Sequence, residues 1–136
     1  MIYTDNCIRI CMDSKEREQF KGFLCGVAVE EPVAFCNWMD FMVKVDQVYD
    51  AIGKPQPSHV IRSFDNTAPA YKPYVANPVR YHDSEAIARL HGQAATCDLL
   101  LQSRHHAEWQ GLLKQEDGTL LGRFSTAEEC LDLLLK

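Results

Sequence analysis

The chain has 136 residues, of which 46% are hydrophobic, and this is enough apolar material for one compact domain over residues 1–136 without metal or disulfide staples. Fourteen Lys and Arg residues against nineteen Asp and Glu residues give a formal net charge of −5, which opposes general nucleic-acid binding. The N-terminus lacks a secretory pattern and no apolar run is long enough to span a membrane, so we expect a cytoplasmic protein without membrane contact.

The first predicted unit, about residues 6–53, begins with strands. Ile8, Ile10 and Met12 recur at the period of two that marks a strand with one buried face. An aromatic–x–Gly–apolar–apolar segment over 20–24 predicts a second, antiparallel strand, and its glycine indicates a bulge or a close backbone approach. A short third strand over 33–35 follows a proline and is therefore expected at a sheet edge.

A helix completes this unit. Asn37 with Asp40 three residues later is an N-cap pattern, because the side-chain oxygens satisfy amide donors that the first turn leaves unpaired. Gly53 and Pro55 end the helix. Apolar side chains at helical spacing form a stripe that we interpret as core. They are Trp38, Phe41, Met42, Val45, Val48, Tyr49 and Ile52.

The connector, residues 54–95, holds five of the six prolines and predicts extended, irregular chain with a short helix over 84–90. Residues 54–89 carry five basic and three acidic side chains, so this is the net-positive part of the sequence. Two of its short segments place a cation beside an aromatic ring, a combination suited to recognition as well as to plain loop anchoring. The candidate binding residues there are Arg62, Phe64, Arg80 and Tyr81.

The second unit, residues 96–136, repeats the first. Alternating Cys97, Leu99 and Leu101 predict a strand, and strands over 109–113 and 120–124 follow, separated by a turn at Gly118. A hydroxyl N-cap at 125–126 opens a final helix with apolar positions 127, 130, 131 and 134.

Residues 8–46 match residues 97–135 at a constant offset of 89 without a gap. Such repeats usually stack so that each copy buries the face the other cannot cover. We therefore predict an α+β protein of two tandem ββ(β)α repeats related by a pseudo-twofold axis. Antiparallel strands pack on two helices. The sheets of the two copies are either joined edge to edge or packed against each other through the helices.

Two resemblances follow from these residues. The chain resembles, over nearly its whole length, a family of small uncharacterised bacterial proteins with two "aromatic–x–Gly…Phe–Ser–x–x–Glu–Leu–Leu" halves, which implies no activity. The matching pieces are Gly22…Phe35…Asp46, Arg62-Ser63-Phe64 and Trp109-Gln110-Gly111…Phe124-Ser125…Glu129…Leu134. The segment 121–129 resembles the end of the plant-type AP2 DNA-binding domain, whose strands enter the major groove. That resemblance implies Arg104, Lys114 and Arg123 as contacts, although residues 97–125 hold three basic side chains against four acidic ones.

Catalytic patterns are missing from the sequence: it has no P-loop, no dinucleotide glycine motif, no nucleophile elbow and no H-E-x-x-H. The best constellation is His105 and His106 with Glu108 and a cysteine, but adjacent histidines on a strand point to opposite faces. The six cysteines contain no C-x-x-C pair and are expected to be reduced thiols. We predict no catalytic residue, no metal ligand and no cofactor.

The function predicted from the sequence is a non-catalytic, cytosolic protein-binding or regulatory module of unknown target, with a homodimer as one arrangement. Open strand edges, the lack of catalytic motifs and the aromatic, net-basic connector favour it. A nucleic-acid-binding module that uses the second repeat's sheet and the connector is the alternative, and a metal- or thiol-dependent enzyme is the third class. Beyond those already named, the candidate binding residues include His105, His106 and Trp109.

Overall fold

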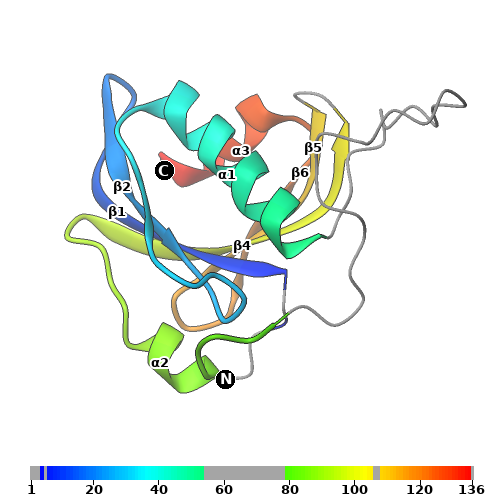
Figure 1. Cartoon of the computed structure of the whole chain (residues 1–136). Coiled ribbons are helices and arrows are strands. Elements are labelled where there is room, and N and C mark those ends of the chain that lie inside the picture. The colour runs from blue at the N-terminus through cyan, green and yellow to red at the C-terminus, as the bar shows by residue number, and fades with distance from the viewer. Residues whose placement is uncertain (1–3, 5, 54–78, 106–107, 136) are drawn as a thin grey trace, which may run out of the picture.

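The structure, a computed structural model, describes residues 4, 6–53, 79–105 and 108–135. Over these residues the chain is an α+β fold with one six-stranded antiparallel sheet and three helices, which confirms the predicted class (Figure 1). The elements are β1 (Cys7–Glu16), β2 (Gln19–Cys25), β3 (Val33–Phe35), α1 (Trp38–Ile52), α2 (Ser84–Ala88), β4 (Ala95–His105), β5 (Glu108–Gln115), β6 (Leu120–Phe124) and α3 (Ala127–Leu134).

The strand order is β3-β2-β1-β4-β5-β6, so each predicted unit supplies three consecutive strands. The two halves meet where β1 pairs with β4, with Arg9 opposite Asp98 and the neighbouring apolar residues opposite one another. Of the two arrangements that the sequence left open, the edge-to-edge sheet is the one observed. Both β3, which follows Pro32 as expected, and β6 lie at sheet edges.

Each hairpin carries the same irregularity. The β1–β2 register shifts between Met12 and Ser14, and the β4–β5 register shifts between residues 101 and 103, which is the repeat offset of 89. The matched glycines, Gly22 and Gly111, face the residues at which these shifts begin. Two separate parts of the sequence therefore build hairpins of one register.

Close backbone approach explains the two glycines. A Cβ atom at Gly22 would overlap the carbonyl oxygen of Cys11 on β1, and one at Gly111 would overlap that of Leu100 on β4. Neither oxygen belongs to a movable side chain, so only a residue without a side chain fits. The prediction of a bulge or close approach at these positions is confirmed.

Helix starts follow the predicted caps. The Asn37 side chain accepts a hydrogen bond from the Asp40 amide at 2.7 Å, and the Asp40 carboxylate accepts from the Cys36 amide at 3.0 Å. In the second half Thr126 and Glu129 make the equivalent bonds, both at 3.1 Å. The pairs of amides so satisfied fix where α1 and α3 begin.

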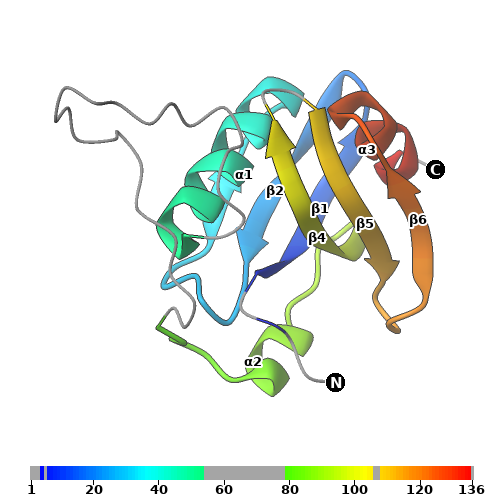
Figure 2. The same cartoon turned by 90° about the vertical axis from the view of Figure 1, so that its right-hand side faces the viewer.

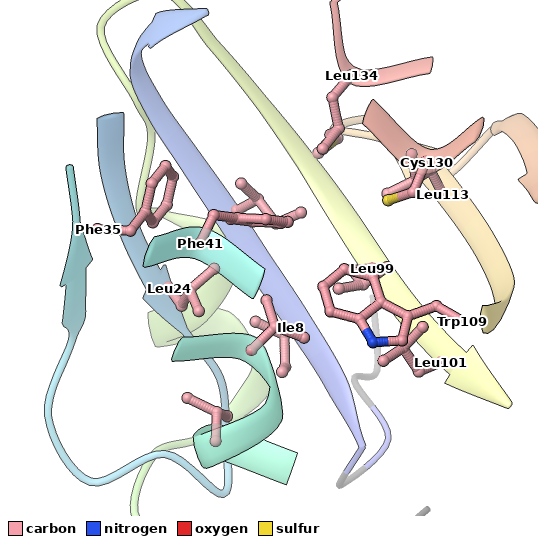
Figure 3. Packing of buried hydrophobic residues seen from close by; sticks show 14 of the residues in the cluster. Ile8, Leu24, Phe35, Phe41, Leu99, Leu101, Trp109, Leu113, Cys130 and Leu134 are labelled. Atoms are coloured by element: carbon pink, nitrogen blue, oxygen red, sulfur yellow. The ribbon is translucent and has the colours of Figure 1, made fainter. Parts of the chain in front are cut away.

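The main core lies between the sheet and the helices α1 and α3, which cover its concave face (Figures 1 and 2). At its centre Phe41 of α1 meets the Trp109 ring of β5 with centroids 6.2 Å apart, and Leu99 lies nearby (Figure 3). Cys130 of α3 lies beside Leu113 in the same layer (Figure 3). The apolar stripe predicted for α3 is therefore buried throughout, and that of α1 is buried except at Trp38 and Met42, which are partly buried.

A second, smaller cluster lies on the other face of the sheet, where α2 packs. Cys11, Cys25, Val27 and Ile87 form it. The short helix begins as predicted, because Asp83 accepts from the Ala86 amide at 2.7 Å. The proline-rich segment 54–78, which includes Arg62 and Phe64, lies outside the described residues. Within the described ranges no helix is long and apolar enough to span a lipid bilayer.

A buried ion pair, which was not predicted from the sequence, connects the two central strands and α2 on this face of the sheet. Arg9 and Asp98, 1% and 2% exposed, approach to 3.0 Å between Nε and Oδ1. The Nη1 atom of Arg9 also donates to the carbonyl oxygens of Ala88 at 2.8 Å and Leu90 at 3.1 Å. The guanidinium thus holds the C-terminal end of α2 against the centre of the sheet, and the buried charges are satisfied on both sides.

Candidate functional site

The strongest candidate for a functional site is a groove between α1 and α3, with a cavity of about 410 Å³. Trp38 and Met42 of α1 form one wall, and Ala127 and Leu131 of α3 form the other. Arg17, in the β1–β2 turn, and Glu128 complete the lining.

Helical spacing explains these walls. Trp38 and Met42 are four residues apart, and so are Ala127 and Leu131, so each pair stacks on one side of its helix. Trp38 and Met42 flank the core stripe of α1 and are partly buried, whereas Ala127 and Leu131 of α3 are buried. Each residue of the first pair lies 89 positions before its counterpart in the second pair, so the groove joins positions that match at the offset of 89.

Apolar surface continues from the groove over the outside of α1. Met39 is 72% exposed and Val43 is 51% exposed. Met39 lies one turn before both Met42 and Val43, so it joins the groove wall to the outer surface of the helix. We call Trp38, Met39, Met42, Val43, Ala127 and Leu131 the helix-groove surface. Within this surface Met39 and Val43 are exposed, Trp38 and Met42 are partly buried, and Ala127 and Leu131 are only 5% and 4% exposed. Neighbouring exposed apolar side chains such as Met39 and Val43 mark interaction sites, whereas single ones carry no such meaning.

This surface was not predicted from the sequence, because the apolar residues of α1 were interpreted as one core stripe. The first two turns of α1 hold apolar side chains at 38, 39, 41, 42, 43 and 45, more than one buried face can accept. Met39 and Val43 are the two outside the stripe. That excess was the signal available from sequence alone.

Charge surrounds the groove unevenly. At one end Arg17 pairs with Asp132 at 3.0 Å, with both side chains more than half exposed, so the pair adds little stability. On α1, Lys44 lies 3.8 Å from Asp40. Together α1 and α3 contain six carboxylates and a single ammonium group, that of Lys44. The helical layer is therefore the acidic side of the described fold.

A second cavity of about 290 Å³ lies at the other side of α1 and includes one predicted binding residue, Tyr81. Tyr81 is 48% exposed, and its amide donates to the Val27 carbonyl oxygen at 2.7 Å. Glu30 and Glu31 line the cavity, and its other lining side chains are mainly small and apolar. Arg80, also predicted, lies exposed beside it in the chain.

The remaining predicted binding residues are scattered. Lys114 on β5 and Arg123 on β6 are exposed, and strand alternation puts them on the sheet face opposite the main core. Trp109 is 0% exposed, so its ring packs in the core and is not presented to a ligand. The backbone of Arg104 and His105 belongs to β4, while His106 lies outside the described residues.

Four of the six cysteines are buried in the fold. Cys11 and Cys25 face each other with sulfurs 3.9 Å apart, and both are buried under α2. Among the residues that the structure describes, no three His, Cys, Asp or Glu side chains gather as metal ligands would. Burial, assisted by the nearby Asp98 charge, raises the pKa of Cys7 and of Cys97 to about 12, and burial likewise raises the pKa of Cys130.

Because burial raises the pKa of these thiols, we expect the free energy of unfolding to fall at alkaline pH. The unfolded thiol ionises near pH 9.0 and the folded Cys97 thiol near 12, so stability from the neutral thiol is complete below pH 9.0 and falls as pH rises toward 12. Cys97→Ala should make the decline shallower by about 1.4 kcal/mol per pH unit in this window, measured by urea unfolding. An unchanged slope in Cys97→Ala would contradict the prediction.

Comparison with protein-family models, curated proteins and solved structures finds no match to this chain.

Proposed function

We propose that this chain is a non-catalytic protein-binding or regulatory module and that the helix-groove surface is its contact face. The observation that carries the proposal is the exposure of Met39 and Val43, 72% and 51%, beside a groove whose walls are apolar. Apolar contact surface buried at the centre of an interface supplies most binding energy, and methionine adapts its shape to a partner.

We also propose that the two halves are copies related by a pseudo-twofold axis through the Arg9–Asp98 pair. Residues 9 and 98 are separated by the repeat offset of 89 and face each other in the central strand pair. An axis at this pair would exchange Ile8 with Cys97 and Ile10 with Leu99. It would therefore convert the cross-strand pair Ile8–Leu99 into the pair Cys97–Ile10, and both pairs are observed. The same axis would pass through the groove, whose walls come from matching positions.

The test of the binding function is capture of partners from nuclease-treated lysate of the native cells, read by mass spectrometry. We compare the chain with the double variant Met39→Gln/Val43→Gln, which keeps the helix and removes two exposed apolar groups. A protein partner should be recovered, and its yield should fall about tenfold in the double variant, as expected for a loss near 1.4 kcal/mol.

Leu120→Gln is the matched control, because Leu120 on β6 is as exposed as Val43, at 51%. Its yield of partner should equal that of the unchanged chain. Equal losses in both variants would contradict the assignment of the face.

Nucleic-acid binding is the second candidate, and one observation favours it: Lys114 and Arg123 are exposed on the same face of neighbouring strands. Partners that disappear with nuclease would support this candidate over the first. Duplex binding should then weaken steeply with salt and be lost on charge reversal at both residues.

A further inference from the structure

We propose that the helix-groove surface binds a basic amphipathic helix of another protein, an inference that rests on the proposed binding function. The occupant is defined by its chemistry: one face of aliphatic side chains for the groove and a flanking face of Lys or Arg. Three features support this choice, namely the shape of the groove, the nature of its walls and the sign of the surrounding charge.

The shape favours a helix. The groove runs between the N-terminal turns of two helices, and its walls are i, i+4 side-chain rows on each. Rows of this kind interdigitate with the rows of a third helix. An extended peptide would instead add to a strand edge, and the edges of this sheet are β3 and β6 rather than the helical layer.

The walls suit aliphatic anchors. Trp38 supplies a broad ring that is stacked on Phe41 with centroids 5.1 Å apart, which holds its orientation from below. Met42 and Met39 offer flexible thioether chains that can rearrange around an inserted leucine or isoleucine. The groove, about 410 Å³ in volume and open to solvent, has room for the anchor side chains of a partner.

The charge selects the partner and disfavours a second copy. Glu128 and Arg17 line the groove, and Arg17 pairs with Asp132 at its end. The two helices hold six carboxylates against Lys44, so this layer stays net negative after Arg17 is counted. Two copies docked through this layer would bring like charges together, which costs binding energy. A cationic helix instead gains from the same field, both in its rate of approach and in its specificity.

The experiment uses a synthetic 18-residue peptide of leucine and lysine patterned as an amphipathic helix, with a leucine and glutamate peptide of the same pattern as comparison. Binding is followed by tryptophan fluorescence, since Trp38 lines the groove while Trp109, the other tryptophan, is buried. We expect the lysine peptide to bind at least tenfold more tightly than the glutamate peptide.

Variants at one or two positions distinguish binding at the helix-groove surface from general attraction between the acidic chain and the basic peptide. Met39→Gln/Val43→Gln should weaken the lysine peptide about tenfold, while Leu120→Gln should stay within twofold of the unchanged chain. Glu128→Gln should weaken it about threefold, and Glu85→Gln, on α2 across the sheet, should not. Equal effects of groove and control variants would overturn the proposal, as would tighter binding of the glutamate peptide.

The two proposals can fail separately. A cellular protein lost from the Met39→Gln/Val43→Gln variant, together with no binding of the lysine peptide, would overturn the helix while leaving the protein-binding function. Sedimentation that shows a dimer, dissociated by the same variant, would identify a second copy as the occupant and overturn the cationic helix.

Discussion

Arg9→Met should lower the free energy of unfolding by about 3–5 kcal/mol, because it leaves the Asp98 carboxylate buried without its charge partner. Asp98 is 2% exposed, so water cannot replace the guanidinium without opening the sheet or moving α2. The variant also removes the donor to the Ala88 and Leu90 carbonyl oxygens, at 2.8 and 3.1 Å. Urea unfolding measures the loss, and amide exchange should show faster exchange in α2 than in α1.

The double variant Arg9→Met/Asp98→Leu is the control for this prediction. Replacing both charges by apolar groups removes the unpaired carboxylate, so most of the lost stability should return. The α2 carbonyl oxygens remain without their donor, so recovery should be incomplete. A change below about 1 kcal/mol in Arg9→Met would show that the pair does not hold this face together.

Gly22→Ala and Gly111→Ala should each cost about 3 kcal/mol or more, because the new methyl group would overlap a backbone carbonyl oxygen on the neighbouring strand. Relief requires separation of two paired strands, β1 from β2 or β4 from β5. Valine at either position should cost more still. Thermal unfolding of purified variants measures the effect.

Gly26→Ala is the matched control, because its added Cβ would lie 3.1 Å from the Cys7 carbonyl oxygen, a contact that a small shift relieves. Its cost should be well below that of the other two. Similar costs at Gly22 and Gly111 are expected if the halves are copies of one unit. Tolerance of alanine at both would refute the close approach as the reason for glycine.

Much of the fold was predictable because it depends on signals within short stretches of chain. The expected third strand of the second unit, 120–124, matches β6, and the expected first helix ends at Gly53, which has φ 89°. Caps at Asn37 and Thr126 lie in the windows that the sequence indicated. Periodicity and capping act over a few residues, so the local sequence contains them.

The functional surface was less predictable. Of the candidate residues, Tyr81 lines the smaller cavity, and Lys114 and Arg123 share an exposed sheet face, but the groove between α1 and α3 was not anticipated. Trp109 was counted as a binding residue because aromatic rings serve both cores and interfaces. Only its place under Phe41 shows that it belongs to the core.

By itself the sequence determined the strands, the helices, their caps and the close backbone approach at Gly22 and Gly111, because each depends on contacts between residues near in the chain. Tertiary structure alone decided three things: that the halves join through β1 and β4, that Arg9 and Asp98 meet, and that α1 and α3 enclose a groove. These three features depend on contacts between segments far apart in the chain. More than one strand edge of each half could pair with the other half, and no local sequence pattern selects which edge does.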